Sequence, residues 1–301
     1  MKTQPHLPAR HLFLAFIVAA IWGSNFVAVK LALDALPPLL LASLRFLFAL
    51  FPAALLVPRP PVPQRELAAY GLLIGVGQFG LMYIAINGHI SPGLASLVVQ
   101  MQVFFTIGLS MWLTHQKLQT FQAVAMLIAA GGIGVIAWHT DAHTNVLGLS
   151  LVLLAALACA CGNLVALRAG QVNMLAYMVW SSLYAVPPLL ALSILLEGPH
   201  AILQGLRVAN AETWAAVLWQ SAANTLFGYA AWAWLLARHS TATVVPMALL
   251  VPVFGMGASA AWLGEPLFPW KLMAAALVIG GLVINLFWPR LRAISTGRII
   301  S

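Results

Sequence analysis

Ten apolar runs, each long enough to cross a bilayer as a helix, dominate this 301-residue sequence. A bilayer core of about 30 Å requires about 20 helical residues. Pro, Gly and charged residues delimit the runs, which we place at 11–30, 38–57, 67–87, 92–114, 119–138, 147–168, 174–196, 211–236, 241–263 and 268–288. The connectors leave no room for a soluble domain. The sequence therefore predicts an all-α integral membrane protein with ten transmembrane helices.

Composition supports the membrane assignment. Hydrophobic residues make up 62% of the chain and charged residues only 7%, which no soluble core of this size requires. The net charge of +8 could suggest a nucleic-acid partner. However, the basic residues stand singly at the ends of apolar runs and form no patch. We therefore predict the lipid bilayer as the chain's surroundings and no nucleic-acid partner.

The positions of the basic residues predict the topology, because Lys and Arg are retained in the cytoplasm during insertion. If both termini are cytoplasmic, ten basic residues fall on the cytoplasmic side: Lys2, Arg10, Arg59, Arg65, Lys117, Arg168, Arg238, Arg290, Arg292 and Arg298. Only Lys30, Arg207 and Lys271 fall on the other side. We expect a multi-pass membrane protein with both termini in the cytoplasm.

The two cysteines, Cys159 and Cys161, are two residues apart within one apolar run. On a helix, side chains at this spacing point in different directions, so the pair suggests neither a disulfide nor a metal site. We interpret both as small buried residues. The sequence predicts no cofactor and no metal.

An internal sequence repeat divides the chain into two halves. The segment "WGSNFVAVK" (22–30) recurs as "ACGNLVALR" (160–168), which aligns Asn25 with Asn163. Later, "VFFTIGLSMWL" (103–113) matches "VFGMGASAAWL" (253–263). Two matches in the same order indicate a duplicated unit of five helices, predicted at 1–143 and 144–301. Because five crossings are an odd number, the second copy is inverted, as in many secondary transporters.

Several motifs resemble the EamA family of the drug/metabolite transporter superfamily. They are "WGSNF", "LRF", the Gly-rich segments "AAGGIGVI" and "IGGLVI", and "WLGEPL". The segments "PPLLLASLRF" and "GLASLVVQMQVFFTI" are similar to the branch of bacterial amino-acid and metabolite exporters that includes cysteine and O-acetylserine exporters. The resemblance implies ten helices in two inverted repeats and export of small metabolites. In "WLTHQKL", His115 stands where "WLGEPL" has Glu265.

Polar residues at membrane depth are the candidates for substrate binding, because they are costly there and mark substrate pathways. The candidates are Asn25, Arg45, Gln78, Tyr83, Asn87, Gln100, Gln102, Asn163, Trp180, Ser181, Asn224, Tyr229 and Trp232. None is an Asp or Glu, so permanent cations are poor candidate substrates. Amides, which donate and accept hydrogen bonds, suit neutral or zwitterionic solutes. Aromatic faces could hold an ammonium group.

Three candidates carry more specific expectations. Arg45 lies near the middle of its helix, where an unpaired cation costs about 3 kcal/mol or more. It either anchors a substrate carboxylate or bonds structurally to backbone carbonyls, and we favour the structural role. Gln100 and Gln102 are two apart, so we expect only one of them to face a cavity.

Two prolines single out run 241–263 as a wall of the pathway. Pro246 and Pro252 each remove a backbone donor, which is expected to free the carbonyls of Ala242 and Ala248. Freed carbonyls at membrane depth are tolerated where they face a cavity. A kink used only for packing is the alternative.

These observations predict an inner-membrane transporter that exports amino acids or related small metabolites by alternating access. Without a membrane carboxylate, facilitated export is the default expectation. One alternative is a carrier or flippase for nucleotide sugars or lipid-linked sugars, which would require several cations in the cavity. Another is an intramembrane enzyme, but no His lies within a predicted span beyond His11 at the very start of the first run, and no HExxH motif occurs. The oligomeric state stays open and is compatible with a monomer.

Overall fold

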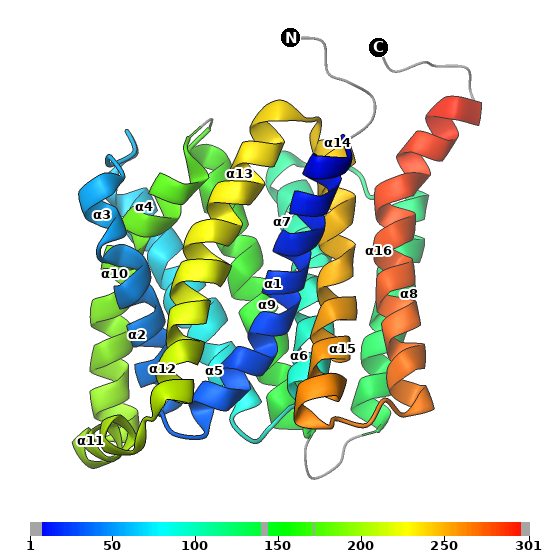
Figure 1. The fold of residues 1–301 in the computed structure, drawn as a ribbon. Helices are drawn as coiled ribbons and strands as arrows, with labels where there is room; N and C mark the ends of the chain where they lie inside the picture. The colour runs from blue at the N-terminus through cyan, green and yellow to red at the C-terminus, as the bar shows by residue number, and fades with distance from the viewer. Residues whose placement is uncertain (1–7, 140–143, 171, 296–301) are drawn as a thin grey trace.

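The computed structural model describes residues 8–139, 144–170 and 172–295, and every regular element within these ranges is helical (Figure 1). The fold class predicted from the sequence, an all-α membrane protein, is confirmed. The predicted boundary between the halves, at 143, lies outside the described residues. So do two of the basic residues used to predict the topology, Lys2 and Arg298.

Five membrane-crossing stretches form the first half of the described chain. They are α1 (Ala9–Leu33); α2 (Pro38–Leu50) with α3 (Ala53–Leu56); α4 (Gln64–Gly71), π-helical Leu72–Gly80 and α5 (Leu81–Ile86); α6 (Pro92–Val98), 3-10 segment Val99–Met101 and α7 (Gln102–Thr114); and α8 (Thr120–Trp138). Most predicted boundaries agree with these within about three residues.

The second half contains five corresponding stretches and one additional helix. They are α9 (Val146–Arg168); α10 (Met174–Leu192) with π-helical Ser193–Glu197; α12 (Ala211–Leu218), π-helical Trp219–Phe227 and α13 (Gly228–Arg238); α14 (Thr241–Val244), 3-10 segment Val245–Leu249 and α15 (Leu250–Leu263); and α16 (Pro269–Ser295). The additional helix is α11 (Pro199–Val208).

The continuous helix over residues 211–238 differs from the others in polarity. In the part of the chain that the structure describes, nine helices are long and apolar enough to cross a membrane by length and composition, and this helix is not among them. Its middle carries Gln220, Ser221, Asn224 and Thr225, all of them buried. Its polar residues therefore face protein, not lipid.

Helix α1 begins and α16 ends at the same end of the bundle, called here the terminal end (Figure 1). The opposite end, which carries α11, is called the far end. Arg168 and Arg238 lie in the last turns of α9 and α13 at the terminal end, whereas Lys30 lies in the last turn of α1 at the far end. The predicted distribution of basic residues over the two faces therefore matches the arrangement of the helices.

Helix α11 occupies a segment that was predicted only as a long connector. It lies across the far end of the bundle (Figure 1), and its apolar side chains Leu203, Leu206 and Val208 are exposed. Gly205 packs against the backbone carbonyl of Ala35. A short amphipathic helix with exposed apolar residues at the end of a bundle fits the membrane interface. The segment is too polar for a span, so a search for apolar runs did not predict a helix there.

Irregular helical segments occur in pairs at matching places in the two halves. Leu72–Gly80 and Trp219–Phe227 are both π-helical, and Val99–Met101 and Val245–Leu249 both form 3-10 turns. π-Helices are rare and often mark functional sites.

The helix ends that follow the Trp-Leu motifs also match. His115 and Gly264 both adopt a left-handed conformation directly after α7 and α15. His115 is therefore the counterpart of Gly264, which corrects its alignment with Glu265. The sequence alignment was one residue out of register because α7 continues for one residue more after its Trp-Leu pair.

The 3-10 segment that contains Pro246 modifies the expectation of free carbonyls. Ala248 O accepts a hydrogen bond from the backbone N–H of Leu250. Pro252 has no N–H to donate to this carbonyl, but the expectation that the carbonyl is free is wrong, because Leu250 supplies a backbone donor two residues further along the chain.

Candidate functional site

A cavity of about 260 Å³ lies between the two halves of the chain. Ligand pockets for drug-sized molecules span about 300–1,000 Å³, so this space fits a small metabolite. Both halves contribute to its lining, and the polar members are Trp22, Asn25, Arg45, Tyr70, Gln78, Gln100, Gln102, Cys159, Asn163, Asn224 and Tyr229. Within the described part of the chain, no Asp or Glu lines the cavity, and Arg45 is its only formal charge.

Arg45 is fully buried and is held by side chains from both halves. Its Nε and Nη2 donate to Thr225 Oγ1 at 3.3 and 3.1 Å, and its Nη1 donates to Tyr83 Oη at 3.0 Å. The guanidinium lies 3.6 Å from the centroid of the Phe79 ring. The expected partners of Arg45 were backbone carbonyls, and the structure replaces them with two hydroxyl groups. Three contacts in fixed directions orient the guanidinium without neutralising it.

The hydroxyl partners of Arg45 have acceptors of their own. Tyr83 Oη donates to Gln220 Oε1 at 2.5 Å, and Thr225 Oγ1 donates to the backbone carbonyl of Gln220 at 2.8 Å. The second bond spans five residues, which is the spacing of a widened π-helical turn. The π-helical segment of the second half thus presents Thr225 to a cation of the first half.

An aromatic wall lies beside Asn25. Trp22 Nε1 donates to the backbone carbonyl of Asn224 at 3.1 Å, and its ring contacts Tyr229 and Trp232 at centroid distances of 5.9 and 5.1 Å. Trp22 and Asn25 are three residues apart on α1, so they share one face of the helix. Asn25 is only 4% exposed, and its Oδ1 has no hydrogen-bond partner among the described residues.

A separate polar group lines the cavity from α7 and α9. Cys159 Sγ donates to Gln102 Oε1, and Asn163 Nδ2 donates to Thr106 Oγ1 at 3.5 Å. Asn163 and Asn25, which the internal sequence repeat aligns, therefore line one cavity, but Asn163 has a side-chain hydrogen bond whereas Asn25 Oδ1 has no partner among the described residues. The two aligned residues therefore have different surroundings.

Gln100 and Gln102 both line the cavity, so the expectation that only one would do so is wrong. The 3-10 segment Val99–Met101 lies across this pair. Residues two apart diverge by about 160° on an α-helix but by about 120° on a 3-10 helix with its three residues per turn. The tighter turn brings both amides toward the same space.

Eight of the thirteen predicted site residues line the cavity: Asn25, Arg45, Gln78, Gln100, Gln102, Asn163, Asn224 and Tyr229. Tyr83 lies behind Arg45, and Trp232 packs on Trp22. Trp180 donates to the carbonyl of Val57 at 3.0 Å, and Ser181 donates to Met178 of its own helix. Asn87 lies at the end of α5. These five residues do not line the cavity.

Sequence reasoning missed Tyr70, Thr225 and the cavity-lining role of Cys159. Tyr70 and Cys159 both line the cavity, and Thr225 orients Arg45. The clustering of Gln220, Ser221, Asn224 and Thr225 within ten residues of one apolar span was the signal that could have identified Thr225. Cys159 carried no such signal, because a lone thiol in an apolar run usually packs as a hydrophobic residue.

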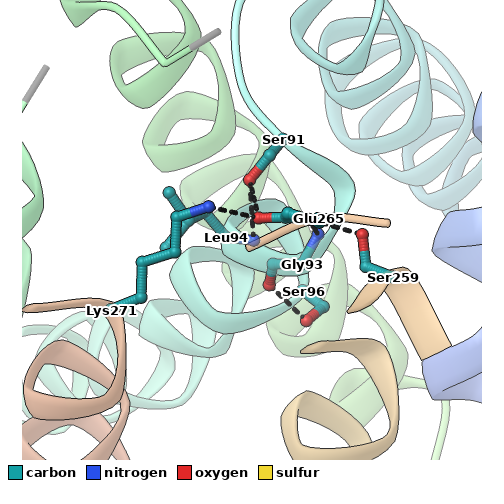
Figure 2. Close-up of polar contacts among 7 residues, drawn as sticks. All are labelled: Ser91, Gly93, Leu94, Ser96, Ser259, Glu265 and Lys271. Carbon is teal, nitrogen blue, oxygen red and sulfur yellow. Dashed lines mark hydrogen bonds and ion pairs between the residues drawn. The ribbon is translucent and has the colours of Figure 1, made fainter. Parts of the chain in front are cut away.

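A second polar cluster lies at the far end, around Glu265 in the loop between α15 and α16 (Figure 2). The Glu265 carboxylate accepts hydrogen bonds from the hydroxyls of Ser91 and Ser259 and from the backbone N–H of Gly93. Lys271 Nζ forms an ion pair with it at 2.8 Å. The two charged side chains are only 6% and 10% exposed. We call these residues the Glu265 cluster.

The Glu265 cluster holds its carboxyl group in the charged form. Burial acts to raise the pKa of Glu265, but the hydrogen bonds from Lys271, Ser259 and Ser91 outweigh burial and lower the pKa below its ordinary value. A lowered pKa means that the cluster contributes stability above the ordinary carboxyl range and loses it as the pH falls through the lower, folded-state value. The cluster is therefore intact at neutral pH.

Within the described ranges, no three His, Cys, Asp or Glu side chains gather in a way that could hold a metal ion. The cavity presents amides, aromatic rings, one thiol and one guanidinium. Such a lining can bind and release a small polar solute, since it offers donors, acceptors and one positive charge.

Comparisons with known proteins agree with this arrangement. The model of the EamA-like transporter family matches residues 9–138 and, separately, 146–287. A probable amino-acid metabolite efflux pump of Salmonella typhimurium is 41% identical over 286 residues, covering 93% of this chain and 96% of that protein. A pump of the same description from Escherichia coli is 36% identical over 285 residues, covering 93% and 95%.

The fold also matches a solved crystal structure. That structure is similar with a TM-score of 0.64 at 16% sequence identity, covering 94% of this chain and 97% of the other. At this identity the likeness concerns the fold alone.

Proposed function

The chain belongs to the EamA-like transporter family, and from this premise we propose that it exports amino acids or closely related small metabolites from the cytoplasm. Its relatives in Salmonella typhimurium and Escherichia coli are described as probable amino-acid metabolite efflux pumps. The central cavity is the proposed substrate site, and its eight predicted lining residues are the proposed contacts.

The observation that carries this proposal is a buried cation without a counter-charge at a cavity. Among the described residues, Arg45 forms no ion pair, yet it is fully buried and lines the cavity. A guanidinium has five donors in a fork that matches a carboxylate. Thr225 and Tyr83 accept three hydrogen bonds from it, which leaves two donors for a substrate. A substrate carboxylate would supply the missing negative charge.

The proposed orientation places the terminal end of the bundle in the cytoplasm. Basic residues concentrate at that end, as the positive-inside rule requires of a cytoplasmic face. Substrate would then enter from the terminal end and leave at the far end. A bacterial inner membrane is the proposed location.

We also propose that the two halves, 1–143 and 144–301, are inverted repeats that rock around the cavity. Separate family matches to each half support this division, as do the paired π-helical and 3-10 segments. Rocking of inverted repeats exposes a central site alternately to the two sides of a membrane.

A carrier for nucleotide sugars or lipid-linked sugars is the weaker candidate. Diphosphate groups call for several cations, whereas Arg45 is the one cation among the cavity-lining residues that the structure describes. The small cavity volume also argues against a sugar nucleotide. No observation favours an enzymatic reaction at this site.

Counterflow into proteoliposomes tests the proposed function. We expect vesicles loaded with an unlabelled amino acid to accumulate the same labelled amino acid, using alanine, serine, cysteine, threonine and leucine in turn. Because no carboxylate among the described residues lines the cavity to carry a proton, accumulation is expected to be the same with and without an imposed proton gradient. Absence of counterflow for all five amino acids would contradict amino-acid transport. Dependence on the proton gradient would contradict facilitated export.

A further inference from the structure

Asn25 presents a buried acceptor with no donor. Its Oδ1 has no partner within the described chain, although the side chain is 4% exposed and lines the cavity. The neighbouring hydroxyl does not serve it, because Ser24 Oγ donates to the carbonyl of Ile21. Buried polar groups are nearly always hydrogen-bonded, so the unpaired amide oxygen of a residue that lines the cavity is an acceptor available to a ligand donor.

The surroundings of Asn25 suit a cationic donor. Trp22 lies three residues earlier on the same face of α1, and Tyr229 joins it in the cavity wall. Aromatic faces attract an ammonium group, and an amide oxygen accepts its hydrogen bond. We infer that Asn25 is a specificity-determining residue that recognises the ammonium group of the substrate. This inference rests on the proposed function and extends it to the substrate class.

Separate recognition of a carboxylate and an ammonium group explains why the cavity lining has one cation and, among the described residues, no anion. Arg45 on α2 would bind the carboxylate of an amino acid, while Asn25 and Trp22 on α1 would bind its ammonium group. A zwitterion brings one charge of each sign, so the cavity needs a cation for the first and only neutral acceptors for the second. A substrate with an amine but no carboxylate would leave Arg45 without a counter-charge.

Substrate analogues in counterflow inhibition test this assignment. For serine, the analogues are 3-hydroxypropionate, which lacks the amine, and serinamide, which lacks the carboxylate. We expect the intact protein to prefer serine over 3-hydroxypropionate by at least tenfold. Asn25→Ala is expected to remove that preference, with inhibition by 3-hydroxypropionate nearly unchanged. Asn25→Asp, which keeps the acceptor, is expected to retain it.

Asn163→Ala is the matched control, because Asn163 lines the same cavity but already has hydrogen-bond partners. Its loss is expected to weaken serine and 3-hydroxypropionate alike. The assignment fails if Asn25→Ala also weakens both compounds equally. The outcome is separate from that of the proposed function, which fails only if the unmodified protein shows no amino-acid counterflow.

A second inference comes from the Glu265 cluster, which joins the two halves at the far end (Figure 2). Ser91 and Gly93 begin α6 of the first half, whereas Ser259, Glu265 and Lys271 belong to the second half. The only other ion pair in the described residues, Lys30–Asp34, is far more exposed, at 37% and 60%. Neither of these ion pairs joins the halves by itself, so the link between the halves consists of the hydrogen bonds that the charged Glu265 carboxylate accepts from Ser91 and Gly93.

A close helix crossing lies about one helical turn from the cluster. A Cβ atom at Gly23 would meet Phe254 Cβ at 2.5 Å and the carbonyl oxygen of Val251 at 2.6 Å. Gly255 in turn packs on Ser96 of α6. The backbones of α1 and α15 thus lie in direct contact, and α15 also packs on the Ser96 side chain of α6, with no room for an added methyl group at either glycine.

The start of α14 and the end of α7 lie at the terminal end and correspond to the start of α6 and the end of α15. Among the described residues, no comparable cluster joins them. Ser240, which precedes α14 as Ser91 precedes α6, bonds to Thr243 of its own half. Because His115 after α7 corresponds to Gly264 after α15, Gln116 stands in the place of Glu265, and the carboxylate has no counterpart there. Among the described residues, a carboxylate therefore links the two halves at the far end and not at the terminal end.

We propose that the Glu265 cluster is a latch that closes the cavity toward the far end. Separation of α6 from α15 breaks the hydrogen bonds that Ser91 and Gly93 donate to the Glu265 carboxylate, which stays paired with Lys271 of its own half. Such a latch favours the conformation that is closed at the far end until the two halves rock apart.

Cysteine labelling tests the latch without any transport measurement. Val99, which lines the cavity, is replaced by cysteine in a background of Cys159→Ala and Cys161→Ala. A membrane-impermeant maleimide is then added to the far side. Glu265→Gln is expected to raise the labelling rate of this cysteine at least tenfold. Asp34→Asn is the matched control, since it breaks the exposed ion pair at the same end, and it is expected to leave the rate unchanged.

A second variant separates loss of the link from misfolding caused by an unpaired Lys271 in Glu265→Gln. The double variant Glu265→Gln, Lys271→Met leaves no buried unpaired charge, and it is expected to show the same raised labelling rate. Both variants are compared only as monodisperse protein. Labelling at the unmodified rate in the double variant, or an equal rise in Asp34→Asn, would overturn the proposed latch.

Discussion

Arg45→Met is expected to reduce amino-acid counterflow at least 100-fold at substrate concentrations below saturation. Hydrogen bonds to charged groups contribute about 1.5–3 kcal/mol each. Loss of two such bonds to a carboxylate corresponds to a decrease of about 100-fold or more. Folding is expected to persist, because Tyr83 and Thr225 donate to Gln220 and keep those acceptors without Arg45. The measurement is the initial rate in proteoliposomes, with thermal stability in detergent measured in parallel.

Arg45→Lys separates charge from geometry. A lysine keeps the positive charge, but its single nitrogen cannot reproduce the three bonds that orient the guanidinium between Thr225 and Tyr83. We expect an intermediate loss of about tenfold, which corresponds to the contribution of one hydrogen bond to a charged group. If the lysine variant transports normally while the methionine variant unfolds, Arg45 serves packing and the proposed carboxylate site is wrong.

Gly23→Ala is expected to lower the unfolding temperature by roughly 5 °C, because α1 and α15 cannot move apart without disturbing α6. Its Cβ would lie 2.5–2.9 Å from Phe254 Cβ, the Val251 carbonyl oxygen and the Gly255 nitrogen. Two of these atoms belong to the backbone, which cannot turn aside as a side chain can. Overpacking of this kind costs about 1–3 kcal/mol, and each kcal/mol shifts the transition by about 2–4 °C in a domain of 150–250 residues.

Gly257→Ala supplies the control on the same helix as Val251 and Phe254. No atom lies within 4 Å of a Cβ built at Gly257, so its replacement is expected to leave the unfolding temperature unchanged or slightly higher. The comparison is made by thermal denaturation of both variants in one detergent. Equal transitions for Gly23→Ala and Gly257→Ala would show that the crossing of α1 and α15 tolerates a methyl group.

The fold could be predicted because lipid imposes simple length and polarity rules on a helix. The runs 92–114 and 119–138 correspond closely to the observed Pro92–Thr114 and Thr120–Trp138. Interruptions of the helices could not be predicted in this way. π-Helical and 3-10 segments depend on which neighbour accepts or supplies a hydrogen bond, as Thr225 shows with the Gln220 carbonyl. Such partners come from the folded chain.

The candidate site was predictable in its polarity and less so in its geometry. Asn25 and Arg45 stood out because polar residues at membrane depth need a reason to be there. Trp180 was an equally polar candidate, but it bonds to a backbone carbonyl at Val57 instead of lining the cavity. The sequence shows the type of each residue and its depth within an apolar run. The direction in which a side chain points depends on helix rotation, which only packing between the halves determines.

The polar helix over residues 211–238 has a consequence for how the protein is made. Translocation machinery inserts a segment according to its apolarity, and the segment that carries Gln220, Asn224 and Thr225 falls short of the apolarity of the nine other spans described. Its partners, Trp22 on α1 and Arg45 on α2, are synthesised and inserted long before it emerges from the ribosome. We therefore expect this helix to need α1 and α2 already in the membrane in order to integrate. The contacts that insert it are then the same contacts that form the binding site.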